Sequence, residues 1–187
     1  MAVNNTANVS VGKGVQGGYF FSAPTTATLP TDYSTALPST YENLGYLTSD
    51  GLVISESVET SDFNDLNGDV IETARSSREE TMQVTFAEKK AATEKELYGQ
   101  AHVTDDHGMM TIDHTNAERD ERIYVFDAIL KNGRRARIIA CKGKVTELGD
   151  VTWASANLVA RQATIKCMVG DDGWSVREIV QSTETTA

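Results

Sequence analysis

The sequence predicts a mainly β fold with one short α-helix, arranged as an antiparallel β-sandwich or a partly closed barrel. Three observations lead to this prediction. Apolar and polar residues alternate over many short segments, as they do in strands that bury one face. An Asn-Gly pair separates two such segments, and no proline interrupts the chain after Pro38. Only residues 90–98 have the composition of a helix.

The first forty residues are predicted to be largely irregular. Residues 1–11 are expected to form an N-terminal arm of small and polar residues. The segment GKGVQG (12–17) matches the glycine spacing of a dinucleotide-binding loop. Aromatic residues and prolines follow it where a helix would have to begin, so a bulged or flexible strand is expected instead. All three prolines lie within 23–40, which predicts a surface loop there.

The stretch from 41 to 99 contains the clearest succession of elements. A strand is expected to begin after the turn residues 49–51, and an acidic loop is expected at 58–69. Extended chain follows at 70–75 and 81–86, where Met82, Val84 and Phe86 fall on one face. The helix predicted at 90–98 is anchored by Leu97 and Tyr98 and ends at Gly99.

The second half of the chain is predicted to consist of strands. Segments 122–131 and 134–144 flank Asn132-Gly133, which predicts a tight hairpin because both turn positions need positive φ. Residues 157–169 form a long strand candidate, and a last strand is expected between Trp174 and Val180. Residues 182–187 are expected to be a flexible tail.

No catalytic or metal-binding arrangement can be recognised in the sequence. The three histidines lie in 101–114 without a ligand spacing typical of zinc, and His107-Gly108 indicates an exposed hairpin turn. No nucleophile stands beside an identifiable base, and no pair of carboxylates is singled out by its surroundings. We therefore expect neither an enzyme nor a cofactor-binding protein.

Length and composition predict one soluble domain over residues 1–187. No apolar run is long enough to cross a membrane, and the N-terminus lacks the basic start of a secretory signal. Cys141 and Cys167 both lie in apolar strand patterns, which favours reduced thiols in the core over a disulfide. These features are typical of a protein made in a cytoplasm.

The net charge of −10 is unevenly distributed along the chain. Residues 41–80 contain ten acids and two bases, whereas residues 131–144 contain six bases and no acid. The acidic excess argues against tight binding of nucleic acid, which requires cations, and its simplest role is solubility. The bases of the hairpin turn could hold phosphate, remain solvated, or contact acids of another subunit.

The order of motifs in the first hundred residues resembles the major tail tube proteins of long-tailed, non-contractile bacteriophages (siphophages). The likeness rests on SAPTTATLPTDYSTAL (22–37) followed by YENLGYLTSDGLVISES (41–57). A strand, an acidic loop, a second strand and a short helix ending in Tyr98-Gly99 continue it. The remaining half of the chain resembles that family only in being rich in strands.

The resemblance implies a structural virion protein with the tail-tube type of β fold. In that family subunits form rings, usually of six, in which neighbouring sheets join into an inner barrel and the rings stack into a hollow tube. Expected partners are other copies of the chain, the tape-measure protein, and the tail terminator and distal tail proteins. Genomic DNA would pass through the lumen without specific binding during ejection, no membrane would be bound, and assembly would occur in the host cytoplasm.

A charged wall that repels phosphate would help DNA to slide through such a tube. The hypothesis is that part of the acidic excess faces the lumen or meets the basic hairpin of a neighbouring subunit. The candidate residues for these inter-subunit or lumen charges are Glu56, Glu59, Asp62, Asp65, Asp69, Glu72, Arg134, Arg135 and Arg137.

Two other functions fit the sequence. A head decoration protein or a distal-tail protein could share this strand-rich composition while occupying another place in the virion. An unrelated cell-surface or carbohydrate-binding module could use Trp153 or Trp174 as a stacking platform, although Trp174 directly after a glycine-rich turn is more typical of core packing.

Overall fold

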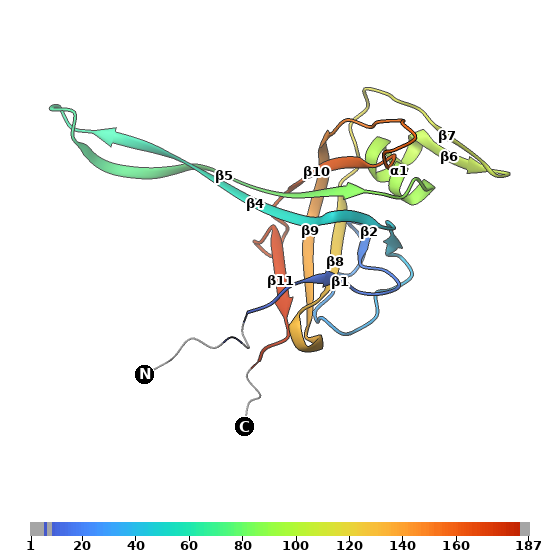
Figure 1. Ribbon diagram of the computed structural model, residues 1–187. Coiled ribbons are helices and arrows are strands. Elements are labelled where there is room, and N and C mark those ends of the chain that lie inside the picture. The colour runs from blue at the N-terminus through green and yellow to red at the C-terminus, as the bar shows by residue number, and fades with distance from the viewer. Residues whose placement is uncertain (1–5, 7–8, 184–187) are drawn as a thin grey trace.

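The computed structural model describes residue 6 and residues 9–183, and Figure 1 shows a body of strands from which one hairpin projects. Its elements are β1 (Lys13–Gly14), β2 (Phe20–Pro24), β3 (Glu42–Asn43), β4 (Leu47–Asn64), β5 (Val70–Phe86), α1 (Ala91–Tyr98), η2 (Gln100–His102), β6 (Val103–Asp106), β7 (Met109–Ile112), β8 (Arg122–Ile129), η3 (Lys131–Gly133), β9 (Arg135–Leu148), β10 (Arg161–Cys167) and β11 (Val176–Val180).

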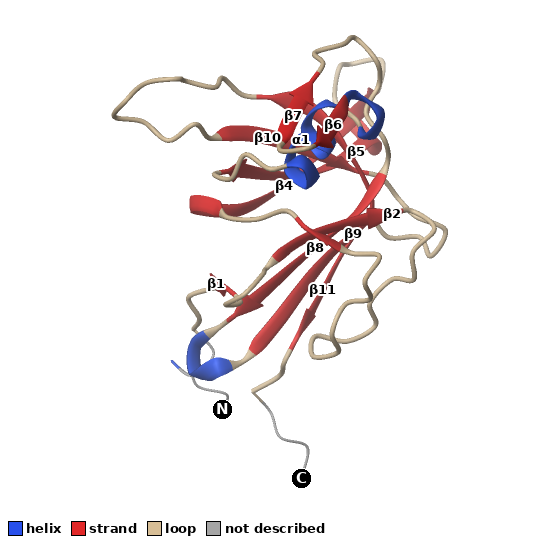
Figure 2. Cartoon of the chain, turned by 90° about the vertical axis from the view of Figure 1, so that its right-hand side faces the viewer, coloured by secondary structure: helices blue, strands red, loops and turns tan. Residues whose placement is uncertain are grey.

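The described strands form one nine-stranded antiparallel sheet and a separate β6–β7 hairpin. The main path of the sheet is β3-β2-β8-β9-β10-β5-β4, while β1 pairs with β8 and β11 pairs with β9. The long strand β9 joins two halves, because residues 136–140 pair with β11 and residues 143–148 pair with β10. Figure 2 shows the two halves diverging like a wedge, so the predicted mainly antiparallel β fold is confirmed and the sheet does not close into a barrel.

The core lies between these two halves. Met82, Val84 and Phe86 are buried while the residues between them are partly exposed, which confirms the alternation predicted for this strand. Phe20 is completely buried, with its ring centroid 5.9 Å from that of Phe86 and 6.0 Å from that of Tyr124. Side chains from distant parts of the chain therefore fill one continuous aromatic and aliphatic cluster.

Gly143 marks a point where two core side chains leave no room for another carbon. A Cβ built on Gly143 would lie 2.7 Å from Tyr124 Cδ2 and 2.8 Å from Ile165 Cγ2, and both neighbours are buried. We expect Gly143→Ala to lower the free energy of unfolding by about 1–3 kcal/mol, because the core must shift to admit the methyl group. Urea unfolding measures this loss. The matched variant is Gly12→Ala, whose Cβ would meet only Leu130 Cδ2 at 3.7 Å, so an equal loss there would contradict the prediction.

Both predicted turn motifs form hairpins. Asn132 and Gly133 have φ angles of 64° and 76°, which is the positive φ predicted for this pair, and they connect β8 to β9. His107 and Gly108, with φ of 50° and 80°, connect β6 to β7. The expectation of an exposed turn in the histidine-containing segment is confirmed by this hairpin.

The helix α1 agrees with its predicted bounds to within one residue. It begins after Lys90 and ends at Gly99, whose φ of 103° stops the helical turn. Leu97 is buried as expected, but Thr93, Glu94 and Glu96 are buried as well. The helix therefore packs against the sheet through a largely polar face, which an apolar pattern could not reveal.

The predicted acidic loop at 58–69 is mostly strand. The strand β4 extends into it as far as Asn64, and the turn that leads to β5 is confined to residues 65–69. Likewise, Ser49-Asp50-Gly51 does not precede a strand but lies in an irregularity within β4, where the register shifts between Leu47 and Leu52. The φ of 67° at Gly51 accommodates this bulge.

The remaining predictions differ from the structure mainly at element ends. The strand expected at 157–169 is shorter, as β10 covers Arg161–Cys167. The loop expected at 23–40 begins after Pro24 and contains no strand before β3. Both cysteines are buried and free, as predicted. The predicted N-terminal arm at 1–11 and the predicted tail at 182–187 lie partly outside the described residues.

Candidate assembly surfaces

The most prominent surface feature is the projecting hairpin, which we define as residues 56–79 of β4, β5 and their turn. Figure 1 shows it extending away from the body of the protein. Every residue from 56 to 79 is exposed except Asp65, which is partly exposed. Such a long solvated hairpin buries too little apolar surface to be explained by the stability of a single chain.

Cross-strand polar contacts hold the projecting hairpin together. Thr73 Oγ1 donates to Asp62 Oδ1 at 2.7 Å, and Ser77 Oγ donates to Glu59 Oε2 at 3.0 Å. Nearer the body, Arg78 Nε donates to Glu56 Oε1 at 2.8 Å, and this hydrogen bond lowers the pKa of the Glu56 carboxyl. These contacts define one hairpin register, so its side chains are presented in a fixed order.

The base of the projecting hairpin is fixed to the body. Arg78 Nη1 donates to Ser175 Oγ at 3.1 Å, and Ser175 Oγ in turn donates to the carboxylate of Glu80. Lys166 Nζ lies 2.5 Å from Glu79 Oε2. Because these contacts join β5 to β10 and to the segment before β11, they set the direction in which the hairpin leaves the body.

Large apolar side chains are exposed at the tip of the projecting hairpin, which we define as residues 63–71. Their exposed fractions are 54% for Phe63, 102% for Leu66, 56% for Val70 and 68% for Ile71. Asp65 Oδ1 accepts hydrogen bonds from the backbone N–H of Asn67 and Asp69, which stabilises the turn and lowers the pKa of Asp65. Clustered apolar groups of this kind mark interaction sites more often than solvated ends.

The six predicted acidic residues share the projecting hairpin. Glu56, Glu59, Asp62, Asp65, Asp69 and Glu72 lie on its two strands and turn. The predicted bases Arg134, Arg135 and Arg137 lie at or just before the start of β9, directly after the β8–β9 turn, which Figure 1 shows at the bottom of the body and away from the hairpin. The structure therefore does not bring the acids and bases together within one chain.

The three arginines have different surroundings. Arg137 is buried and donates to Asp127 from Nε at 2.6 Å and from Nη2 at 2.8 Å, and this pairing raises its pKa. It also donates to the Asp32 and Thr35 carbonyls, which fixes the proline-containing loop to the sheet. Arg134 is partly buried and binds Ser10 and the Gln181 carbonyl. Arg135 is exposed.

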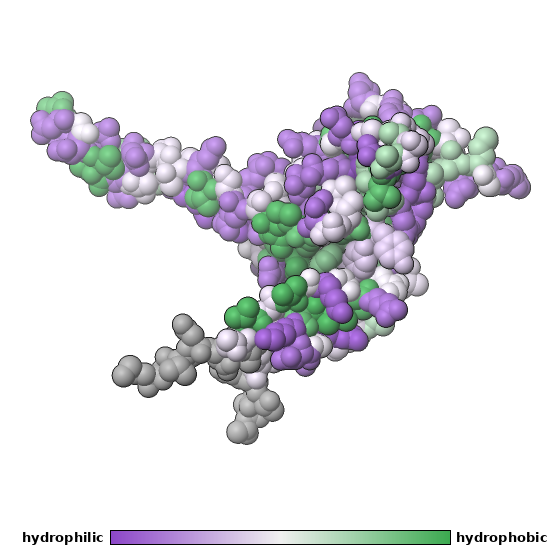
Figure 3. All heavy atoms as spheres, viewed as in Figure 1, coloured by the Kyte–Doolittle hydropathy of each residue, from purple (hydrophilic) through white to green (hydrophobic). Residues whose placement is uncertain are grey.

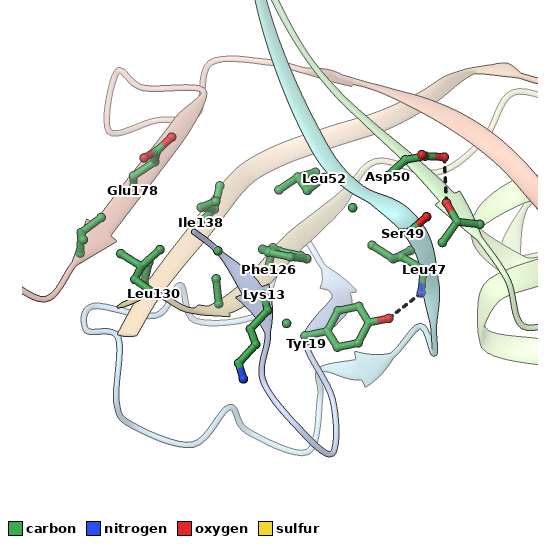
Figure 4. Close-up of a pocket in the computed structure, with 17 residues that line it drawn as sticks. Lys13, Tyr19, Leu47, Ser49, Asp50, Leu52, Phe126, Leu130, Ile138 and Glu178 are labelled. Carbon is green, nitrogen blue, oxygen red and sulfur yellow. Dashed lines mark hydrogen bonds between the residues drawn. The ribbon is translucent and has the colours of Figure 1, made fainter. Parts of the chain in front are cut away.

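An apolar cleft opens between the two halves of the sheet, with a volume of about 580 Å³. Figure 4 shows Leu47 and Leu52 of β4 on one side, facing Phe126 of β8, Leu130 just after β8 and Ile138 of β9 on the other. Leu47 N–H donates to the hydroxyl of Tyr19 at 2.6 Å, which closes one end. Figure 3 shows apolar side chains on both walls of this hollow.

Sequence reasoning missed both the exposed tip and the cleft. The tip could have been found, because Phe63, Leu66 and the pair Val70-Ile71 interrupt an otherwise polar segment. The cleft could not, because its lining extends from Gly12 to Val180 and no local pattern connects these residues. Within the described residues no three His, Cys, Asp or Glu side chains gather as metal ligands, and no helix is long and apolar enough to cross a membrane.

Comparison with known proteins gives the family. The family model described as "Phage tail tube protein" matches residues 1–183. The chain belongs to the phage tail tube protein family. The predicted resemblance is thereby confirmed, and with it the expectation that the protein is a structural component of a phage tail and not an enzyme.

Two solved structures show weaker similarity to this tail tube protein. One comes from the virion of a native gene transfer agent particle, with 12% identity and a TM-score of 0.40, covering 78% of this chain and 92% of that one. The other is the tube-terminating cap of an anti-feeding prophage, with 11% identity and a TM-score of 0.39, covering 93% of this chain and 96% of that one. The sequence has no significant match among curated proteins.

Proposed function

We propose that this tail tube protein forms the tube of a long-tailed, non-contractile phage by stacking rings of six subunits around a channel for genomic DNA. Membership of the family supports a role in the tail, and the projecting hairpin is the observation that supports polymerisation. Its exposed apolar tip needs a partner, and an identical subunit can supply a complementary surface at every step of a growing tube.

The open edges of the sheet support the same conclusion. Strands β3 and β4 end the path of the sheet, and unpaired edges invite pairing with another chain. Ring formation would cover such edges with neighbouring subunits without stopping growth along the tube axis. The tape-measure protein inside the channel, and the terminator and distal tail proteins at its ends, are the partners such a tube requires. Assembly in the host cytoplasm fits the two free cysteines.

The charge of the chain fits passage of DNA without binding. A net charge of −10 per subunit corresponds to about 60 negative charges in a ring of six, which repel phosphate over distances of about 10 Å at moderate salt. We propose that acids of the projecting hairpin face either this channel or the exposed Arg135 of a neighbouring subunit.

The tube proposal is tested by imaging the purified protein. Sedimentation combined with negative-stain electron microscopy should show rings or hollow filaments with six-fold symmetry. A head decoration protein would form neither, and a distal tail protein would form single rings that do not stack. Assemblies without a continuous channel would overturn the proposal.

A charge reversal tests the contact between the acidic hairpin and Arg135. We expect Arg135→Glu to slow assembly about tenfold at low ionic strength, and much less at high ionic strength, because screened charges steer association weakly. Light scattering during assembly measures this rate. Adding Glu72→Arg to the Arg135→Glu variant should restore the assembly rate if residue 72 of one subunit contacts residue 135 of another. Equal slowing at all salt concentrations, or no rescue by any acid-to-arginine change on the hairpin, would contradict the contact.

A further inference from the structure

The apolar cleft and the apolar tip of the projecting hairpin are two surfaces that both expose apolar side chains to water. The walls of the cleft carry the partly exposed side chains of Leu52, Phe126, Leu130 and Ile138. The tip carries Leu66, which is fully exposed, together with three other large apolar residues. Each surface keeps apolar groups in water, and each would gain by covering the other.

The chain cannot bring its own tip to its own cleft. The contacts of Arg78, Glu79 and Glu80 with the body fix the direction of the hairpin, and Figure 1 shows the tip far from the strands that form the cleft. The occupant must therefore come from another molecule. In a tube made of identical subunits, every tip has a cleft of another copy available to it.

The size of the cleft favours the same pairing, and its charges restrict the orientation of the tip. A volume of about 580 Å³ is that of a pocket able to receive several large side chains. The tip carries Asp65 and Asp69 beside its apolar groups, and Lys13 lines the cleft. Asp50 and Glu178 also line the cleft but lie away from Lys13 in Figure 4, so the acidic turn is favoured only in the orientation that places it beside Lys13.

We propose that the cleft between the two halves of the sheet is the docking site for the hairpin tip of a second copy, with Leu66 as the inserted side chain. This inference rests on the proposed tube and specifies which surfaces of two subunits meet. It also explains why the two halves of the sheet stay apart, because the cleft between them would receive the hairpin of a neighbouring subunit.

Disulfide trapping between two differently labelled copies tests the docking. Leu66→Cys places a thiol on the tip, and Val180→Cys places one on the cleft, at a side chain that is 44% exposed. The native thiols interfere little, because both are buried and burial raises the pKa of Cys167 to about 12 and also raises that of Cys141. Mixed and oxidised under assembly conditions, the two variants should form a heterodimer on a non-reducing gel.

The control pairs Leu66→Cys with Leu158→Cys, a 70% exposed position outside the cleft. We expect about tenfold less heterodimer from this pair, because a disulfide needs its two Cα atoms within about 7 Å. Tubes that form without a crosslink between positions 66 and 180 would overturn the docking and leave the tube proposal intact. A crosslinked species without rings or filaments would support the docking and overturn the tube.

Two further outcomes would also overturn the docking. Equal crosslinking at positions 158 and 180 would show that the tip samples the whole surface. If the thiol introduced by Val180→Cys were protected from alkylation in the isolated monomer, the cleft would already be covered by the chain's own residues. The unfolding midpoint of each cysteine variant shows that it is folded, since all three positions are on the surface.

Discussion

Replacing Glu96 by alanine is expected to lower the free energy of unfolding by about 3–5 kcal/mol, since removing one partner of a buried ion pair leaves the other charge unpaired. The side chain of Glu96 is almost fully buried and accepts four hydrogen bonds. They come from Ser22 Oγ at 2.7 Å, Arg122 Nε at 3.1 Å, Gln100 Nε2 at 3.1 Å and Tyr124 OH at 2.8 Å.

The loss is large because every partner is positioned by another element. Arg122 is buried in β8, and without the carboxylate its guanidinium would have only the longer 3.4 Å contact with Ser22 in this cluster. Burial, reinforced by the neighbouring carboxylate, raises the pKa of Tyr124 well above its usual value, so the phenol remains a donor. Glu96 therefore attaches α1 to β2 and β8 at once.

Urea unfolding of two further variants separates this network from a general effect of losing a glutamate. Glu118→Ala removes an exposed ion pair with Lys144, and we expect only a small change. Glu96→Gln keeps the shape and one acceptor oxygen but loses the charge and the second acceptor, so its loss of stability should be smaller than that of the alanine variant. If all three variants unfolded at the same urea concentration, the network would not contribute to stability.

The features that could be predicted from the sequence are those determined by neighbouring residues. Alternation in Met82, Val84 and Phe86 depends on one buried face, and the Asn132-Gly133 turn depends on positive φ at adjacent positions. Both are local properties of the chain. The match with the tail tube family likewise followed from an ordered set of short motifs.

The features that escaped prediction are contacts between residues distant in the sequence and strands with both faces exposed to solvent. Ser22 and Glu96 are separated by 74 positions, and Arg122 and Glu96 by 26, so no pattern could place them together. Residues 58–69 of the projecting hairpin are predicted as a loop because neither face of the hairpin is buried, and without a buried face the alternation that identifies strands disappears. Its strands are nevertheless paired throughout by backbone ladders.

Shortening the projecting hairpin is expected to abolish tube assembly while leaving the subunit as stable as before. Ser61 and Ala74 are paired across β4 and β5, so residues 62–73 can be replaced by Asn-Gly, which suits a two-residue turn. The deleted residues are exposed, apart from the partly exposed Asp65, and the contacts of Arg78 and Glu80 with the body are retained. We expect the free energy of unfolding to change by less than about 0.5 kcal/mol.

The effect on assembly should be much larger. Burial of even two of the four apolar side chains of the tip would contribute about 3 kcal/mol or more per subunit contact. Since about 1.4 kcal/mol corresponds to a tenfold change in affinity, the shortened protein should need over about a hundredfold higher concentration to form tubes. Sedimentation and negative-stain imaging across a concentration series measure this shift.

A control that shortens the exposed β6–β7 hairpin at its His107-Gly108 turn should assemble normally, because that hairpin has no comparable apolar cluster among its described residues. If the shortened projecting hairpin still allowed tubes at the original concentration, the subunits would have to be held by other surfaces, and the hairpin would have lost its proposed role in polymerisation.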